Sequence, residues 1–214
     1  MHRAIVRFGP LYGIASILIG GLGWVILIGA DLPGAQEAGV DEIVAFWIES
    51  GGKAKTAAWF SVISAVLMVA FGAWVSMTVR ERGATLVSIT AGMGAVVFAA
   101  GLTIDGSVNA LLGLAAGDLP AESVVTLSAL TEFMYLPYLA GLVLITVSLS
   151  AAAGMTGIIP SWLAMVGFVT AAIAIIPHYE VMQFGMLLSV LWMLATGIFM
   201  YRDAVRIRRA AATV

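Results

Sequence analysis

The sequence has no cysteine, only two histidines and few charged residues. Without a thiol, disulfides, cysteine-ligated zinc, iron–sulfur clusters and thiol catalysis are all excluded. His2 and His178 are the only imidazoles, which argues against a haem held by paired histidines. No glycine-rich loop follows a strand-like run, so nothing supports nucleotide binding. The net charge is -2 and no basic patch lies away from the ends of the hydrophobic runs, which argues against a nucleic-acid partner.

Apolar residues, in contrast, are abundant. They make up 62% of the chain, charged residues make up 10%, and the mean hydropathy is +1.07. Soluble domains average roughly 45–50% apolar and about 25% charged residues. A chain of 214 residues has too small an interior to bury this much apolar surface, so lipid must cover part of it. We therefore predict an all-α integral membrane protein, with one domain that spans residues 1–214.

Six hydrophobic runs are candidates for membrane spans, because a span needs about 20 mostly apolar residues. None of them alternates as a strand would. The first run is longer than the roughly 7–15 apolar residues of a signal peptide, so we interpret it as a span. The predicted spans are 8–30, 56–79, 84–104, 133–153, 159–176 and 181–201.

The basic residues predict the orientation of this bundle. With six spans, 8 of the 10 basic residues fall on one side of the membrane. Because lysine and arginine are enriched in cytoplasmic segments, this side is expected to be the cytoplasm, and both termini to lie there. The expected location is the bacterial cytoplasmic (inner) membrane. The eight residues are Arg3, Arg7, Arg80, Arg82, Arg202, Arg206, Arg208 and Arg209.

Between the first two spans, the segment Asp41–Ser50 has an amphipathic pattern. Ile43, Phe46 and Trp47 share one helical face, and the acidic residues lie largely on the other. The pattern predicts a short amphipathic helix on the outer surface, with its apolar face turned toward lipid or the bundle. The pair Gly51–Gly52 is expected to end this helix.

The apolar stretches on both sides of Gly117–Pro120 are longer than a span requires. Residues 84–116 would form a helix of roughly 50 Å, against a hydrocarbon thickness of about 30 Å. The pattern therefore predicts an antiparallel helical hairpin that extends beyond the membrane. Asp105 lies 12 positions before Gly117 and Glu132 lies 12 positions after Pro120, which predicts two carboxylates at the same height.

These two carboxylates belong to a candidate polar cluster at the outer ends of the spans. Carboxylate and imidazole groups are suitable ligands for a divalent cation, which gives a candidate metal site of Asp105, Glu132, His178 and Glu180. Tyr135, almost one helical turn after Glu132, is a further candidate member. The same residues also suit a proton relay or a cation-attracting mouth, or they are span ends that water solvates. No other cofactor is predicted.

The segment Ile158–Gly167 reads Ile-Ile-Pro-Ser-Trp-Leu-Ala-Met-Val-Gly and contains a Pro-x-Trp-Leu-x-x-x-Gly pattern. It resembles the start of a span in a family of small bacterial membrane proteins, the domain of unknown function numbered four-three-eight-six. The chain length and the number of spans are also similar. The resemblance implies a bacterial polytopic membrane protein and carries no activity or site residue with it.

Three functional interpretations are compatible with the sequence. The first is a non-enzymatic membrane protein, either an accessory subunit or a small binding protein. Its expected partners are the lipid bilayer and a second membrane protein or a further copy of the chain. The second is a proton- or cation-coupled transporter that uses the outer acidic cluster, and the third is a metalloenzyme at the same cluster. Transport requires a polar path inward from Glu132, and the scarcity of polar residues there favours the first interpretation.

Overall fold

The computed structural model describes residues 2–28, 38–176 and 178–211, which form helices without any strand in these ranges. The predicted all-α membrane bundle is confirmed. The helices are α1 (His2–Ile28), α2 (Val40–Glu49), α3 (Gly51–Glu81), α4 (Thr85–Ala115), α5 (Ala121–Thr131), α6 (Tyr135–Thr156), α7 (Ser161–Ala174) and α8 (Tyr179–Ala211).

Five helical segments in the described part are long and apolar enough to cross a membrane. They are Phe8–Leu27, Gly51–Glu81, Thr85–Ala115, Ala121–Thr156 and Phe184–Arg206. The predicted fifth span, 159–176, is the shorter helix α7, which Pro160 precedes. At 14 residues α7 is roughly 21 Å long, less than the hydrocarbon thickness. The bundle is therefore built of five long apolar helices and one short one.

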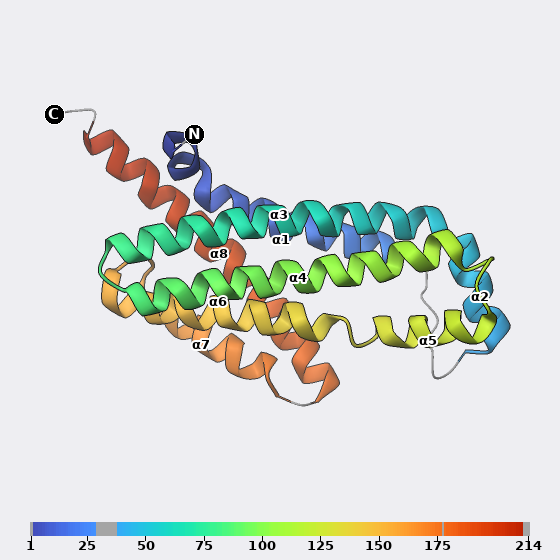
Figure 1. Cartoon of the computed structure of the whole chain (residues 1–214). Helices are drawn as coiled ribbons and strands as arrows, with labels where there is room; N and C mark the ends of the chain where they lie inside the picture. The colour runs from blue at the N-terminus through green and yellow to red at the C-terminus, as the bar shows by residue number, and fades with distance from the viewer. Residues whose placement is uncertain (1, 29–37, 177, 212–214) are drawn as a thin grey trace.

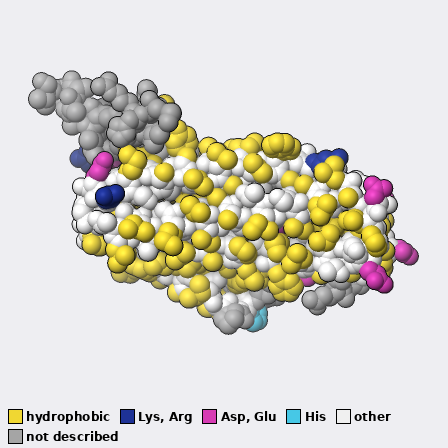
Figure 2. All heavy atoms as spheres, viewed as in Figure 1, with side chains coloured by type: hydrophobic (Ala, Val, Ile, Leu, Met, Phe, Trp, Pro, Cys, Tyr) yellow, Lys and Arg dark blue, Asp and Glu magenta, His cyan; other side chains and the backbone are white. Residues whose placement is uncertain are grey.

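Figure 1 shows α3, α4 and α6 running side by side, with α1 behind them and α8 crossing obliquely. Helices α2 and α5 lie at one end of the bundle, which we call the α2 end. The turn between α3 and α4 lies at the opposite end, which we call the Arg82 end. There Arg82 forms an ion pair with Asp203 of α8 at 3.7 Å. Figure 2 shows acidic side chains gathered at the α2 end and mostly hydrophobic side chains between the two ends.

The predicted amphipathic helix is confirmed as α2, which closes the α2 end. Ile43, Phe46 and Trp47 are buried in a cluster that includes Leu112 of α4 and Val124 of α5. Trp47 is completely buried, and its Nε1 donates a hydrogen bond to Oγ of Ser128 at 3.1 Å. The apolar face of α2 therefore packs against protein and not against lipid.

Helix α2 ends at Glu49, with Ser50 as its C-cap, so it ends just before Gly51–Gly52 as expected. Helix α3 begins directly at Gly51, five residues before the predicted span. A side chain at Gly51 would collide with the carbonyl oxygen of Gly113 in α4. Gly51 of α3 and Gly113 of α4 thus allow the two helices to touch at the α2 end. Lys53 and Lys55 lie in this first part of α3, before the predicted apolar span.

The hairpin predicted around Gly117–Pro120 is also present, with α4 on one side and α5 and α6 on the other (Figure 1). Its second arm is interrupted at Glu132–Met134. Pro137 explains the interruption, because it has no N–H to donate and its ring crowds the carbonyl one turn earlier, at Phe133. The chain instead makes short-range bonds there, such as Leu136 N–H to the Phe133 carbonyl at 3.1 Å.

Glycine also sets the distance between α4 and α6, which frame the site described next. A Cβ added at Gly141 of α6 would lie 2.6 Å from Cα of Phe98 and 2.7 Å from the carbonyl oxygen of Gly94. A Cβ added at Gly101 would similarly lie 3.0 Å from the Pro137 carbonyl carbon. The two backbones are therefore in direct contact over more than one turn.

Candidate functional site

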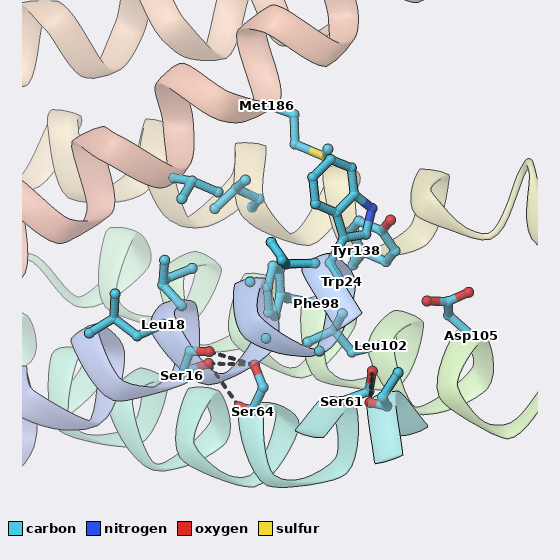
Figure 3. Close-up of a pocket in the computed structure, with 18 of the residues that line it drawn as sticks. Ser16, Leu18, Trp24, Ser61, Ser64, Phe98, Leu102, Asp105, Tyr138 and Met186 are labelled. Atoms are coloured by element: carbon cyan, nitrogen blue, oxygen red, sulfur yellow. Dashed lines mark hydrogen bonds between the residues drawn. The ribbon is translucent and has the colours of Figure 1, made fainter. Parts of the chain in front are cut away.

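The described part of the chain contains a cavity of about 670 Å³ inside the bundle. Helices α1, α3, α4, α6 and α8 all contribute to its walls. This volume lies within the roughly 300–1,000 Å³ of typical small-molecule sites. Figure 3 shows its lining side chains, with Ser16 and Ser64 near one end and Asp105 at the other.

The cavity opens between α1 and α8. The exposed residues among those that line it all belong to these two helices, whereas the lining residues of α3, α4 and α6 are buried or partly buried. On α1 the exposed residues are Leu18, Gly21, Trp24 and Val25, and on α8 they are Phe184 and Leu187. Because α1 and α8 are apolar outer helices, the mouth faces the region that lipid occupies.

A close contact between α1 and α8 lies nearer the Arg82 end than this mouth does. A Cβ added at Gly197 of α8 would lie 2.7 Å from Cγ1 of Ile14 in α1. At this level the backbone of α8 at Gly197 therefore packs against the side chain of Ile14. Toward the α2 end their residues line the cavity, and Figure 1 shows the oblique course of α8 relative to α1.

The wall of the cavity is almost entirely apolar at its middle. Phe98 and Leu142 are buried there, and Phe98 packs edge-to-face on Tyr138 with ring centroids 6.2 Å apart. At the far end, Oγ of Ser16 donates to the Ser64 carbonyl and Oγ of Ser64 donates to the Ser16 carbonyl, both at 2.8 Å. These two serines satisfy each other, so that end of the cavity presents little free hydrogen-bonding capacity.

The polar end of the cavity is formed by Asp105 and Asn109, which lie one turn apart on α4. The amide nitrogen of Asn109 donates to Oδ1 of Asp105 at 3.1 Å. The amide oxygen of Asn109 is buried and has no hydrogen-bond partner among the described residues. The hydrogen bond therefore uses an N–H of the Asn109 amide, and acceptor sites on the oxygens of Asp105 and Asn109 remain in excess.

Asp105 carries the only charge among the described side chains that line the cavity. No described lysine, arginine or histidine forms an ion pair with it. A carboxylate that is partly withdrawn from water and has no cationic partner is costly in a membrane protein. Its carboxylate is thus suited to receive a positive or hydrogen-bond-donating group.

The helix register relates this end to the other predicted carboxylate. Gly101 packs against Pro137 and Tyr138, and Asp105 lies one turn further toward the α2 end. The backbone of Asp105 is therefore level with the interruption before α6, in which Glu132 lies. Glu132 is partly exposed, and the equal height that the sequence predicts agrees with this register.

The other members of the predicted cluster lie elsewhere. Tyr135 packs against a small separate core formed by α6, α7 and α8, which includes Leu139 and Met182. His178 is exposed in the turn before α8. The side chain of Glu180 lies outside the described residues. Among the side chains that are described, no three histidine, aspartate or glutamate residues gather closely enough to hold a metal ion.

The sequence analysis named Asp105, which lines the cavity, as a candidate, but it named neither Asn109 nor the cavity. Asn109 had a usable signal, because an amide four residues after a carboxylate on one helix can bond to it. The cavity had no such signal, since its walls come from helices far apart in the sequence.

No protein-family model, curated protein or solved structure matches this chain. The case for a function therefore comes from the cavity, and the family resemblance of Ile158–Gly167 stays a prediction.

Proposed function

We propose that this chain is a non-enzymatic membrane protein that binds a hydrophobic small molecule taken from the bilayer. The observation that carries the proposal is the apolar cavity of about 670 Å³ whose mouth lies between α1 and α8. A molecule dissolved in lipid reaches such a mouth by lateral diffusion, without crossing water. Phe98, Leu102 and Leu142 then replace the lipid chains around it.

The proposed membrane is the bacterial cytoplasmic membrane, with both termini in the cytoplasm. Arg80, Arg82 and Arg202 lie at the Arg82 end, which the positive-inside rule assigns to the cytoplasm. The α2 end, with Asp41 and Glu42 in the first turn of α2, then faces outward. In this orientation the mouth opens into the outer half of the bilayer.

Binding explains the cavity better than transport does. A proton or cation pathway needs polar groups that follow one another through the protein. Besides Asp105 and Asn109, the hydroxyl groups in the described cavity wall are those of Tyr138, of Ser61, which donates to the Ala57 carbonyl, and of the mutually satisfied Ser16 and Ser64. Apolar Leu102, Phe98 and Leu142 form the wall between them. A metalloenzyme would require several convergent ligands, and Asp105 is the only carboxylate in the described cavity wall.

Photolabelling of the protein in lipid nanodiscs tests the proposal. A neutral aryl-alkyl diazirine is activated by light, and the labelled residues are located by mass spectrometry. We expect labelling of Leu102 and Leu142 that an excess of the non-photoreactive analogue abolishes. Labelling of lipid-facing residues such as Met93 and Met155 should persist, because bulk lipid exposure is not saturable.

Two glycine variants provide a matched comparison. A Cβ added at Gly21, at the mouth, meets nothing within 4 Å, and the same is true at the exposed Gly154 of α6. Gly21→Trp should obstruct the mouth and reduce labelling of Leu102 and Leu142 at least several-fold, whereas Gly154→Trp should not. The proposal is rejected if the inner residues are not labelled saturably, or if Gly21→Trp labels like the unmodified protein.

A further inference from the structure

We propose that the ligand of this cavity is a compact amphipathic amine, whose protonated primary amino group binds at Asp105 and Asn109 while its apolar body fills the cavity. This inference rests on the proposed function and specifies the class of its ligand. The ligand is a molecule with a single ammonium group and a single apolar body.

The charge of the cavity wall favours a cationic ligand. The described lining residues include one carboxylate and no basic side chain, and the carboxylate forms no ion pair with any described residue. An anionic head group would bring a negative charge to this carboxylate without a cation to balance it. An ammonium group instead compensates the charge of Asp105 in an apolar environment, where such pairing is strong.

The hydrogen-bonding groups at the polar end of the cavity also favour an ammonium group. Asp105 accepts one bond, from Asn109, and keeps further acceptor sites on its two oxygens. The Asn109 oxygen is buried without a partner among the described residues, although buried polar atoms are normally bonded. A primary ammonium group carries three donors and no acceptor, so it complements this surplus of acceptors.

The position of Asp105 along the membrane also suits an amphipathic amine. Arg82 and Thr85 mark one boundary of the apolar region, and Asp105 lies about 30 Å further along α4. This distance matches the hydrocarbon thickness of about 30 Å, so Asp105 lies near the opposite boundary. Phe98, Leu142 and Leu18 lie deeper in the bilayer than Asp105. An amphiphile in the lipid leaflet on that side has its head group at the boundary and its apolar body deeper in the membrane. The cavity has the same orientation, with its polar end at the boundary and its apolar part deeper.

The size of the cavity and the chemistry of its wall suit the same class of ligand. A volume of about 670 Å³ suits a compact ligand rather than a two-chain phospholipid. The lining also contains the aromatic rings of Trp24, Phe98 and Tyr138. Aromatic faces attract a nearby cation and pack well against an apolar body, which suits both parts of an amphipathic amine.

Competition against the neutral diazirine tests the inference with four probes that share one chain: dodecylamine, dodecyltrimethylammonium, dodecanol and dodecanoate. The readout is the concentration that halves labelling of Leu102 and Leu142, corrected for the measured partition of each probe into the nanodiscs. Dodecylamine should compete best. The quaternary probe keeps the charge but lacks N–H donors and should be weaker, and dodecanoate should be weakest.

The Asp105→Asn variant keeps the shape of the side chain and removes its charge. It should weaken dodecylamine about tenfold to a hundredfold, the effect expected of a charge-assisted hydrogen bond. Dodecanol and the neutral diazirine should bind as before, which also shows that the cavity is intact. Asn109→Ala should weaken dodecylamine a few-fold and leave the quaternary probe unchanged.

The outcomes separate the two proposals. If the neutral diazirine does not label the unmodified protein saturably, the proposed function and this inference are both overturned. Saturable labelling with equal competition by dodecylamine and dodecanol overturns only the amine inference. Equal competition by the primary and quaternary amines, or an unchanged dodecylamine value in Asp105→Asn, contradicts the hydrogen-bonded ammonium.

Discussion

Replacement of Gly141 by alanine should destabilise the bundle far more than the same change at Gly154, on the same helix. The added Cβ at Gly141 would lie 2.6 Å from Cα of Phe98 and 2.7 Å from the Gly94 oxygen. Carbon atoms in ordinary contact are about 3.5–4.0 Å apart. The two helices must therefore separate by roughly 1 Å, because both neighbours are backbone atoms that no rotamer change can move.

The magnitude follows from two opposing terms. Overpacking of this kind typically costs about 1–3 kcal/mol, and contact between two backbones puts Gly141 toward the upper part of that range. Alanine favours a helix over glycine by up to about 1 kcal/mol. This second term largely cancels when Gly141→Ala is compared with Gly154→Ala, where nothing lies within 4 Å of the added atom. We expect a difference of about 2 kcal/mol between the two variants.

Unfolding by sodium dodecyl sulfate in mixed micelles, followed by far-ultraviolet circular dichroism, measures this difference. Gly141→Ala should unfold at a clearly lower detergent fraction than the unmodified protein, and Gly154→Ala at the same or a higher fraction. Phe98 and Leu142 also line the cavity, so photolabelling of the cavity should change in Gly141→Ala only. Equal unfolding midpoints for the two variants would refute the close packing of α4 and α6.

Three further predictions address the α2 end, the α1–α3 interface and the topology. Trp47→Ala should reduce the free energy of unfolding by about 3–5 kcal/mol, since the ring is fully buried, and Trp47→Phe by about 1 kcal/mol from its lost hydrogen bond, both measured in the same detergent titration. Ser16→Ala and Ser64→Ala should each cost about 0.6 kcal/mol, and a double-mutant cycle should show that the two losses are coupled. Because the chain has no cysteine, single cysteines give an unambiguous topology: an impermeant maleimide added outside cells should label a cysteine at Gly117 and miss one at Glu81. The reverse labelling pattern would invert the proposed orientation.

The sequence predicted those elements whose residue pattern is set within a single helix, by whether each of its faces meets water, lipid or protein. The apolar face of α2 follows from the spacing of Ile43, Phe46 and Trp47, which is a local property. The apolar runs likewise locate the membrane helices, because lipid imposes a length and a hydropathy on each of them. Helix ends were less accurate, since hydropathy marks the part in lipid while Gly51 extends α3 beyond it.

The site was only partly predictable, for a physical reason. The sequence indicates Asp105 as a candidate site residue because a carboxylate at the edge of a membrane span is costly. Its neighbours in space depend on the angle between α1 and α8, which is set by contacts such as that of Gly197 with Ile14. These two residues lie at opposite ends of the chain, and no local periodicity encodes their pairing.

Gly21 illustrates how the structure separates two roles of glycine. On α1, a Cβ at Gly13 would lie 2.8 Å from the Phe71 ring and one at Gly20 would lie 2.8 Å from Oγ of Ser64, so both glycines are required for packing on α3. Gly21 has no such neighbour within 4 Å and stands at the mouth of the cavity. Gly21→Ala should therefore raise the free energy of unfolding by up to about 1 kcal/mol through helix propensity, and photolabelling of Leu102 should persist because a methyl group leaves the mouth open. Gly20→Ala, its adjacent control, should be less stable than Gly21→Ala in the detergent titration. A Gly21→Ala variant that is destabilised would mean that this position is packed, and that the mouth does not lie between α1 and α8.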